Sequence, residues 1–75
     1  MEKLLEMLHR IRPDVDFESC ENLVFDGIIE SFDIVMIMGA ISEEYGITVP
    51  PREIKIQNFN SAKAMLEMIE RINNQ

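Results

Sequence analysis

The sequence predicts an all-α fold: a four-helix bundle of three main helices, a short helix between the last two, and a long first loop. Apolar residues recur at helical spacing in three segments of the chain. No segment shows the alternation of apolar and polar residues that is typical of a strand. At 75 residues, 47% of them hydrophobic, the chain fits one small domain that buries about 60% of its unfolded surface.

The first helix is predicted over residues 2–11, because its apolar residues share one face and Pro13 follows its end. The next segment, residues 13–29, is rich in apolar side chains but has no regular period. We expect a long loop that packs on the helices, with Ile28 and Ile29 anchoring its end in the core. Loops of this length are uncommon unless they are functional.

The second helix is predicted over residues 31–45, with Ser31 at or next to its N-cap, Asp33 in its first turn and Gly46 at its end. This helix is apolar on nearly all sides. Its predicted solvent-facing line consists of Asp33, Met36, Ala40 and Glu43.

After an extended connector, Pro51 is expected to open one short helical turn within residues 51–56. Asn58 or Asn60 is then expected to cap a last helix over residues 61–72. The inward stripe of this helix is predicted to consist of Ala62, Met65, Leu66, Ile69 and Ile72.

Acidic residues outnumber basic ones by fourteen to seven, which gives a net charge of -7. Such a field repels nucleic acid and anionic membranes, so we expect basic protein surfaces as partners. The longest apolar run, residues 34–41, is far shorter than the roughly 20 residues of a membrane-spanning helix. One cysteine and no signal-like N-terminal pattern lead us to expect a cytoplasmic, reduced setting.

Little in the sequence favours catalysis by this chain alone. His9 is the single histidine and is remote in sequence from any nucleophile, so we expect a surface or boundary position. Cys20 has Glu18 and Glu21 as neighbours, which disfavour its thiolate, and is expected to be a half-buried loop thiol. A calcium loop starting at Asp14 lacks the Gly and Glu that its sixth and twelfth positions need. We expect neither an enzyme nor a metal site.

Ser31 stands between two acidic residues in an otherwise apolar stretch. Its simplest interpretation is a helix N-cap. A second interpretation follows from its flanks, where Asp26 and Gly27 mark a turn and Phe32 and Val35 are expected to fix the helix start on the core. Ser31 then presents its hydroxyl to solvent from a rigid platform.

The stretch DGIIESFD, residues 26–33, resembles the signature of acyl and peptidyl carrier proteins. In that signature a turn with Gly, two apolar residues, an acid, Ser and a large apolar residue open the second helix of a small acidic bundle. The segments SFDIVMIMGAISEEYGITVP and NFNSAKAMLEMIERI are similar to that helix with its exit and to the last helix. The resemblance covers nearly the whole chain and implies a single carrier domain over residues 1–75, with an acyl-carrier-protein-like four-helix bundle.

The resemblance implies that Ser31 receives 4'-phosphopantetheine from coenzyme A through a separate magnesium-dependent phosphopantetheinyl transferase. The thiol of this arm then holds an acyl or aminoacyl group as a thioester. An acyl- or aminoacyl-activating ligase loads it, and acyltransferase or synthase enzymes receive it. The carrier is expected to be a monomer. It is also expected to have no catalysis of its own, since a serine hydroxyl with no local base is a weak nucleophile. Partner recognition is assigned to Glu30, Phe32, Asp33, Met36 and Glu43, with Glu44 beside them.

The sequence departs from fatty-acid carriers at Phe32, where Leu is common, and at Met36, where acids are common. The second helix therefore offers a partly apolar docking face for a specialised partner, unless Met36 leans onto the neighbouring loop. A cleft that shelters an acyl chain, or alternatively plain core, is expected at Met38, Ile41, Ile54, Phe59, Met65 and Met68. The alternative function is an unmodified acidic helical interaction module, in which Ser31 is only a cap.

Overall fold

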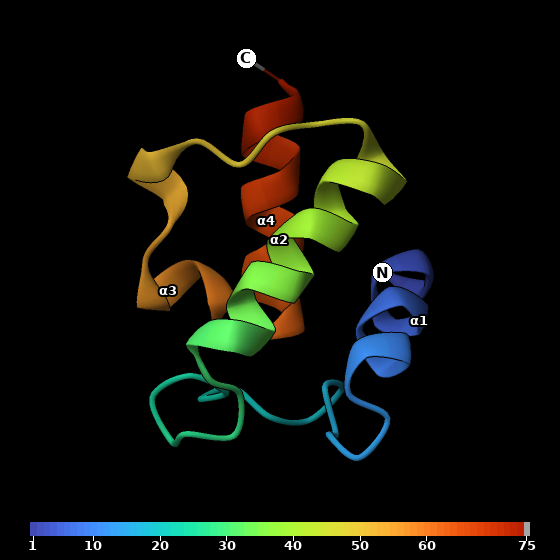
Figure 1. Ribbon diagram of the computed structural model, residues 1–75, viewed down its shortest axis with the longest axis vertical. Coiled ribbons are helices and arrows are strands. Elements are labelled where there is room, and N and C mark those ends of the chain that lie inside the picture. The colour runs from blue at the N-terminus through green and yellow to red at the C-terminus, as the bar shows by residue number, and fades with distance from the viewer. Residues whose placement is uncertain (75) are drawn as a thin grey trace.

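The computed structural model describes residues 1–74, and all regular secondary structure in this range is helical. Its elements in chain order are α1 (Glu2–Ile11), α2 (Ser31–Tyr45), the 3₁₀ turn η1 (Pro51–Glu53), α3 (Ile56–Phe59) and α4 (Ala62–Asn73). α1 runs antiparallel to α2 and contacts both α2 and α4, while α3 packs against α4 (Figure 1). The predicted all-α class is confirmed for the described part of the chain.

The ends of α1 and α2 agree with the sequence-based prediction. α2 ends at Gly46, which has the left-handed backbone conformation with φ of 65° and donates its N–H to the Ser42 carbonyl at 3.0 Å. Glycine adopts this conformation readily because it has no Cβ. Local signals were therefore sufficient to place both helices.

The cap of α4 and the presence of a second short helix differ from the prediction. Ser61 is the N-cap of α4, and its Oγ accepts a hydrogen bond from the Ala64 N–H at 3.0 Å. Asn58 and Asn60 do not have this role, because both amides bind other parts of the chain. The turn opened by Pro51 is present as η1, but the sequence pattern does not predict α3.

The long loop between α1 and α2 contributes side chains to the core, as predicted. Ile29 is buried at its end and confirms the expected anchor, whereas Ile28 is exposed and the same expectation for it is wrong. The buried apolar side chains come from this loop, from α1, α2 and α4, and from the segment between α2 and α4. They are Leu4, Met7, Leu8, Val15, Phe17, Leu23, Ile29, Ile37, Ile41, Val49, Phe59, Ala62, Met65, Met68 and Ile69.

The inward face of α2 consists of Asp33, Ile37 and Ile41, which are spaced four residues apart. Phe32 and Val35, predicted to fix the helix start on the core, are instead 72% and 58% exposed, so that prediction is wrong. The physical reason is that α2 is apolar on nearly all sides, so helical periodicity alone does not decide which face turns inward.

A polar cluster of buried Glu53 and Asn58 with exposed Arg71 joins η1, α3 and α4. The Asn58 Nδ2 donates to the Glu53 carbonyl at 2.7 Å and to its Oε1 at 2.9 Å. Arg71 from α4 donates to Glu53 Oε1 and to Asn58 Oδ1, both at 3.0 Å. The hydrogen bond from Arg71 lowers the pKa of Glu53, although burial opposes this effect. The cluster ties the otherwise irregular segment after α2 to the last helix.

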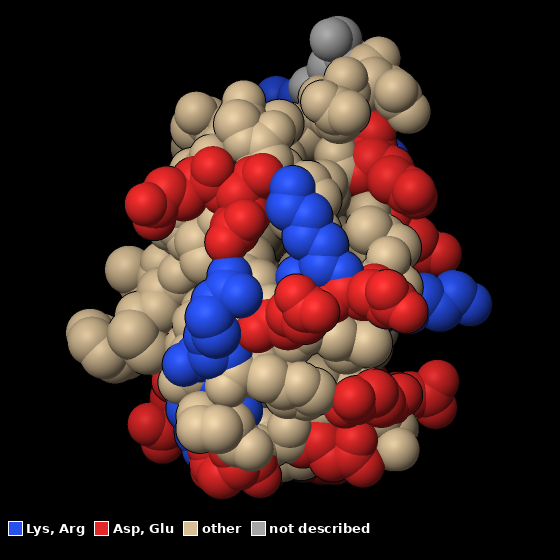
Figure 2. Space-filling view, turned by 90° about the vertical axis from the view of Figure 1, so that its right-hand side faces the viewer, with Lys and Arg blue, Asp and Glu red and all other residues tan. Residues whose placement is uncertain are grey.

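Charges of both signs lie side by side on the face of the molecule over α1 (Figure 2). Arg10 Nη2 lies 2.6 Å from Glu44 Oε1, and Lys3 Nζ donates to the Glu44 carbonyl at 2.8 Å. These contacts join α1 to the end of α2. None of the described helices has the length and apolar character that a bilayer crossing requires.

Candidate functional site

Ser31 is the first residue of α2 and its side chain is exposed. Glu30 is the N-cap, so Ser31 lies next to the cap rather than at it. The N–H groups of a first helical turn have no partner within the helix, and the positive end of the helix dipole lies there. A negatively charged group attached to Ser31 is therefore electrostatically favoured by the backbone around it.

The residues before Ser31 form a compact hydrogen-bonded turn on a buried leucine. The Leu23 carbonyl accepts the N–H groups of Ile28 at 2.9 Å and Ile29 at 3.0 Å. Gly27 has a φ of 72°, which is strained for residues with a Cβ. Leu23 itself is fully buried, so its hydrogen bonds attach the chain that leads into α2 to the core.

Asn60, just before α4, holds the same turn from the other side. Its Oδ1 accepts the N–H groups of Val24 and Phe25, each at 3.0 Å. Its carbonyl accepts the Leu23 N–H at 2.8 Å. Three consecutive backbone donors of the turn thus bind one residue that is 35 or more positions away in sequence.

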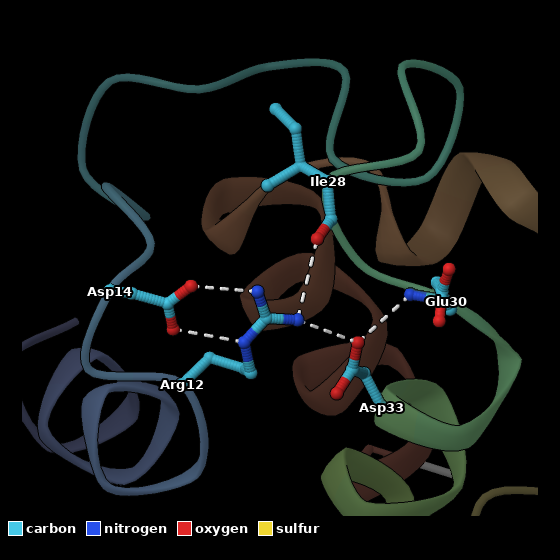
Figure 3. Close-up of polar contacts among 5 residues, drawn as sticks. All are labelled: Arg12, Asp14, Ile28, Glu30 and Asp33. Carbon is cyan, nitrogen blue, oxygen red and sulfur yellow. Dashed lines mark hydrogen bonds and ion pairs between the residues drawn. The ribbon is translucent and has the colours of Figure 1, made fainter.

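Asp33 lies beneath the start of α2 and is only 7% exposed, so the prediction that it faces solvent is wrong. Its Oδ2 accepts the Glu30 N–H at 3.0 Å, and the two residues form a capping box. The same oxygen accepts Arg12 Nη1 at 2.9 Å (Figure 3). This carboxylate is occupied within the chain and is not available to a partner.

Arg12, the residue that follows α1, also pairs with Asp14 through two parallel hydrogen bonds, Nε to Oδ1 at 3.0 Å and Nη2 to Oδ2 at 2.8 Å. These bonds raise the pKa of Arg12 and lower the pKa of Asp14 to about 2. Arg12 Nη1 additionally reaches the Ile28 carbonyl at 3.4 Å. One guanidinium, on the residue that follows α1, therefore contacts the beginning of the loop, its end and the first turn of α2 (Figure 3).

Exposed apolar side chains flank Ser31 on both sides in the sequence. Large apolar side chains usually avoid water, and their grouping marks surfaces that other molecules cover. The five within six positions of Ser31 are Phe25, Ile28, Phe32, Val35 and Met36. We call them the apolar flank.

The predicted recognition residues do not form one cluster. Glu30, Phe32 and Met36 are exposed in or next to the first two turns of α2. Glu43 is also exposed, but twelve residues along the helix place it about 18 Å from Ser31 along the axis. Together with Glu44 it borders a hollow of about 430 Å³ between α1 and α2.

The predicted solvent-facing line of α2 is correct only in part. Met36 is 36% exposed and Glu43 is exposed, while Ala40 is half-buried and Asp33 is buried. The line fails where α2 meets α1, because the pattern alone does not show that Arg12 draws Asp33 inward.

The residues proposed for an acyl cleft belong mainly to the core. Ile41, Phe59, Met65 and Met68 are fully buried, which confirms the core interpretation for them. Ile54 is exposed. It lines a hollow of about 180 Å³ together with Phe59 and with Ile34, Lys55 and Ile56.

His9 and Cys20 lie where the sequence analysis expects them. His9 is half-buried beside Phe17, with Nε2 3.1 Å from Glu18 Oε1. Cys20 is half-buried in the loop. The described residues bring together no group of three or more histidine, cysteine or carboxylate side chains that could hold a metal ion.

Comparison of the chain with protein-family models, with curated proteins and with solved structures found no match.

Proposed function

We propose that the chain is an acyl or aminoacyl carrier with an acyl-carrier-type helical bundle, and that Ser31 carries a 4'-phosphopantetheine arm. The observation that carries this proposal is the exposed Ser31 at the first residue of α2, four residues after Gly27 of the Asp26–Gly27 turn. The resemblance of residues 26–33 to the carrier signature concerns this same place in the fold. The order of the helices and the long first loop also agree with that family.

The attachment is a phosphoryl transfer onto the serine. The Ser31 Oγ attacks the phosphorus that bears the pantetheine group in coenzyme A, the P–O bond of the pyrophosphate breaks, and adenosine 3',5'-bisphosphate leaves. The hydroxyl proton passes to a base of the transferase. The chain places no histidine beside Ser31, since His9, its single histidine, contacts Glu18 instead. Activation of the hydroxyl therefore belongs to the transferase.

The start of α2 suits the product of this reaction. The phosphodiester adds one negative charge next to the positive end of the helix dipole and to backbone N–H groups of the first turn. The arm extends from an exposed side chain, so its thiol is free to enter the active sites of other enzymes. The chain supplies position, and the partner enzymes supply catalysis.

The partner surface that we propose combines exposed acids with the apolar flank. Glu30 and Glu43 offer charge to basic residues of transferase, ligase and synthase enzymes. Phe32 and Met36 offer apolar contact between them. An enzyme that reaches the Ser31 hydroxyl must cover the first turn of α2, so it meets Glu30, Phe32 and Met36 there, whereas only a larger contact also reaches Glu43.

The proposal is tested with the full-length chain, coenzyme A, Mg²⁺ and a promiscuous phosphopantetheinyl transferase. Intact-protein mass spectrometry should show the gain of one phosphopantetheine on the wild type and none on Ser31→Ala. Ser19→Ala removes another exposed serine hydroxyl, from the loop, and is the matched control that should be modified like the wild type.

Absence of a mass gain on the wild type, under conditions that modify a known carrier, would reject the carrier function. The unmodified interaction module would then be the better interpretation, and Ser31 would be only part of a helix start. A mass gain on Ser31→Ala would instead place the modification at another residue.

A further inference from the structure

Arg12 connects both flanks of Ser31 to the end of α1. On one side of Ser31, its Nη1 contacts the Ile28 carbonyl at 3.4 Å. On the other side, the same nitrogen donates to Asp33 Oδ2 at 2.9 Å. The bidentate pair with Asp14 holds the guanidinium plane in place (Figure 3).

Asp33 links Arg12 to the backbone next to Ser31 through hydrogen bonds. Its Oδ2 accepts both the Arg12 Nη1 and the N–H of Glu30, the residue directly before Ser31. Residues 28–30 and residue 33 determine where the Ser31 backbone lies. Both are therefore anchored by the Arg12 side chain, directly at Ile28 and Asp33 and through Asp33 at Glu30. The Ser31 hydroxyl itself stays exposed.

We infer that Arg12 is a positioning residue for the reaction at Ser31: it holds the loop end and the first turn of α2 in the arrangement that the transferase binds. The inference rests on the proposed function, because the hydroxyl that it positions is the one to be modified. A chain segment that is already ordered loses less conformational freedom when a partner binds it. Loss of the anchor leaves only a fraction of molecules in the competent arrangement, and the apparent dissociation constant equals the intrinsic one divided by that fraction.

The geometry requires arginine and not only a positive charge. Arg12 uses Nε, Nη1 and Nη2 to reach Asp14, Asp33 and the Ile28 carbonyl at once. Lysine offers a single ammonium point on a flexible stem and cannot reproduce this planar fork. Arg12→Lys therefore keeps the charge but loses the shared anchor, which separates positioning from charge neutralisation.

Arg10, in the last turn of α1 and two residues before Arg12, provides a matched control. It also pairs with a carboxylate of α2, but with Glu44 near the opposite end of that helix from Ser31. Arg10→Gln therefore removes one positive charge and one contact between α1 and α2 without touching the start of α2.

Amide hydrogen exchange tests whether Arg12 stabilises residues 28–34, independently of any modification of Ser31. In full-length Arg12→Gln and Arg12→Lys, amides of residues 28–34 should exchange at least about tenfold faster than in the wild type, which reflects local opening. Amides of residues 65–69 in α4 should keep their rates, and Arg10→Gln should behave like the wild type throughout. Unchanged exchange at residues 28–34, or equal acceleration in α4, would overturn the inference.

Transferase kinetics with coenzyme A and Mg²⁺ test the consequence for Ser31. Both Arg12 variants should lose on the order of tenfold in kcat/KM, mainly through a higher KM for the carrier, as displacement of a reacting group predicts. Wild-type KM in Arg12→Gln, or full recovery in Arg12→Lys, would overturn the positioning role and leave the carrier function intact. Lack of modification of the wild type would instead refute the carrier function, while the exchange data would still report on the anchor.

Discussion

Arg12 Nη1 lies 2.9 Å from Asp33 Oδ2 and joins the end of α1 to the first turn of α2, although 21 positions separate the two residues in the chain. A carboxylate that is buried without a partner is strongly unfavourable, whereas a paired and hydrogen-bonded one is tolerated. The ion pair therefore favours the rotation of α2 in which Asp33, Ile37 and Ile41 face inward. That rotation leaves Phe32 and Met36 on the outer side, next to Ser31.

The acid titration of Asp14 should report directly on its pair with Arg12. Hydrogen bonding to Arg12 lowers the pKa of Asp14 to about 2, below the usual value of about 3.9. Because the folded-state pKa is the lower one, the pair contributes to stability above pH of about 4, and the contribution is lost as the pH falls toward about 2. NMR detection of the Asp14 carboxyl carbon measures this midpoint.

In Arg12→Gln the Asp14 midpoint should rise toward its usual value, whereas Arg10→Gln should not move it. A wild-type midpoint near that of an isolated aspartate would contradict the bidentate pair. Because Asp14 is exposed, the shift should also shrink at high salt.

Asn60→Ala should destabilise the fold by loosening the turn that precedes Ser31. The substitution removes the acceptor of the Val24 and Phe25 N–H groups but keeps the backbone bond to Leu23. A buried backbone donor left without a partner costs about 1–3 kcal/mol, and of these two donors the Val24 N–H is the part-buried one, so the loss should lie at the lower end of this range. Urea unfolding measures this loss, and each kcal/mol should lower Tm by about 4–8 °C in a domain of this size.

Asn73→Ala is the control for that measurement, since Asn73 is exposed at the end of α4. Its effect should stay within about 0.5 kcal/mol. Equal stability of Asn60→Ala and the wild type would mean that water replaces the Asn60 side chain without loss.

Met36→Glu should weaken enzyme docking without unfolding the chain. Met36 is 36% exposed, so the new carboxylate can stay in solvent and stability should change by no more than about 0.5 kcal/mol. Loss of an interface contact worth roughly 1 kcal/mol reduces kcat/KM of the transferase about fivefold. Rates are measured with the same transferase and coenzyme A as for Ser31→Ala.

Asn73→Asp adds the same negative charge at the exposed last residue of α4, a helix whose end lies at the opposite end of the molecule from the start of α2 (Figure 1). It should leave the transfer rate unchanged. Unchanged kinetics in Met36→Glu would remove Met36 from the proposed docking surface.

The all-α class, the ends of α1 and α2, and the position of Ser31 at the start of α2 could all be predicted from local patterns in the sequence. These features depend on local signals: apolar residues at helical spacing, a serine with acidic neighbours at a helix start, and a glycine that takes a positive φ at Gly46. Each of these signals acts within a few residues, so the local sequence is sufficient to predict the structure that depends on it.

The inward face of α2 and the contacts that hold the start of this helix could not be predicted, because both depend on residues that are distant in the sequence. α2 is apolar on nearly all sides, so its rotation depends on a distant partner, Arg12, that no periodicity reveals. Asn60 likewise resembles a helix cap in sequence, yet its side chain binds the turn at Val24 and Phe25. The physical reason is the same in both cases: a polar group takes the partner that burial brings to it, and burial is a property of the whole fold.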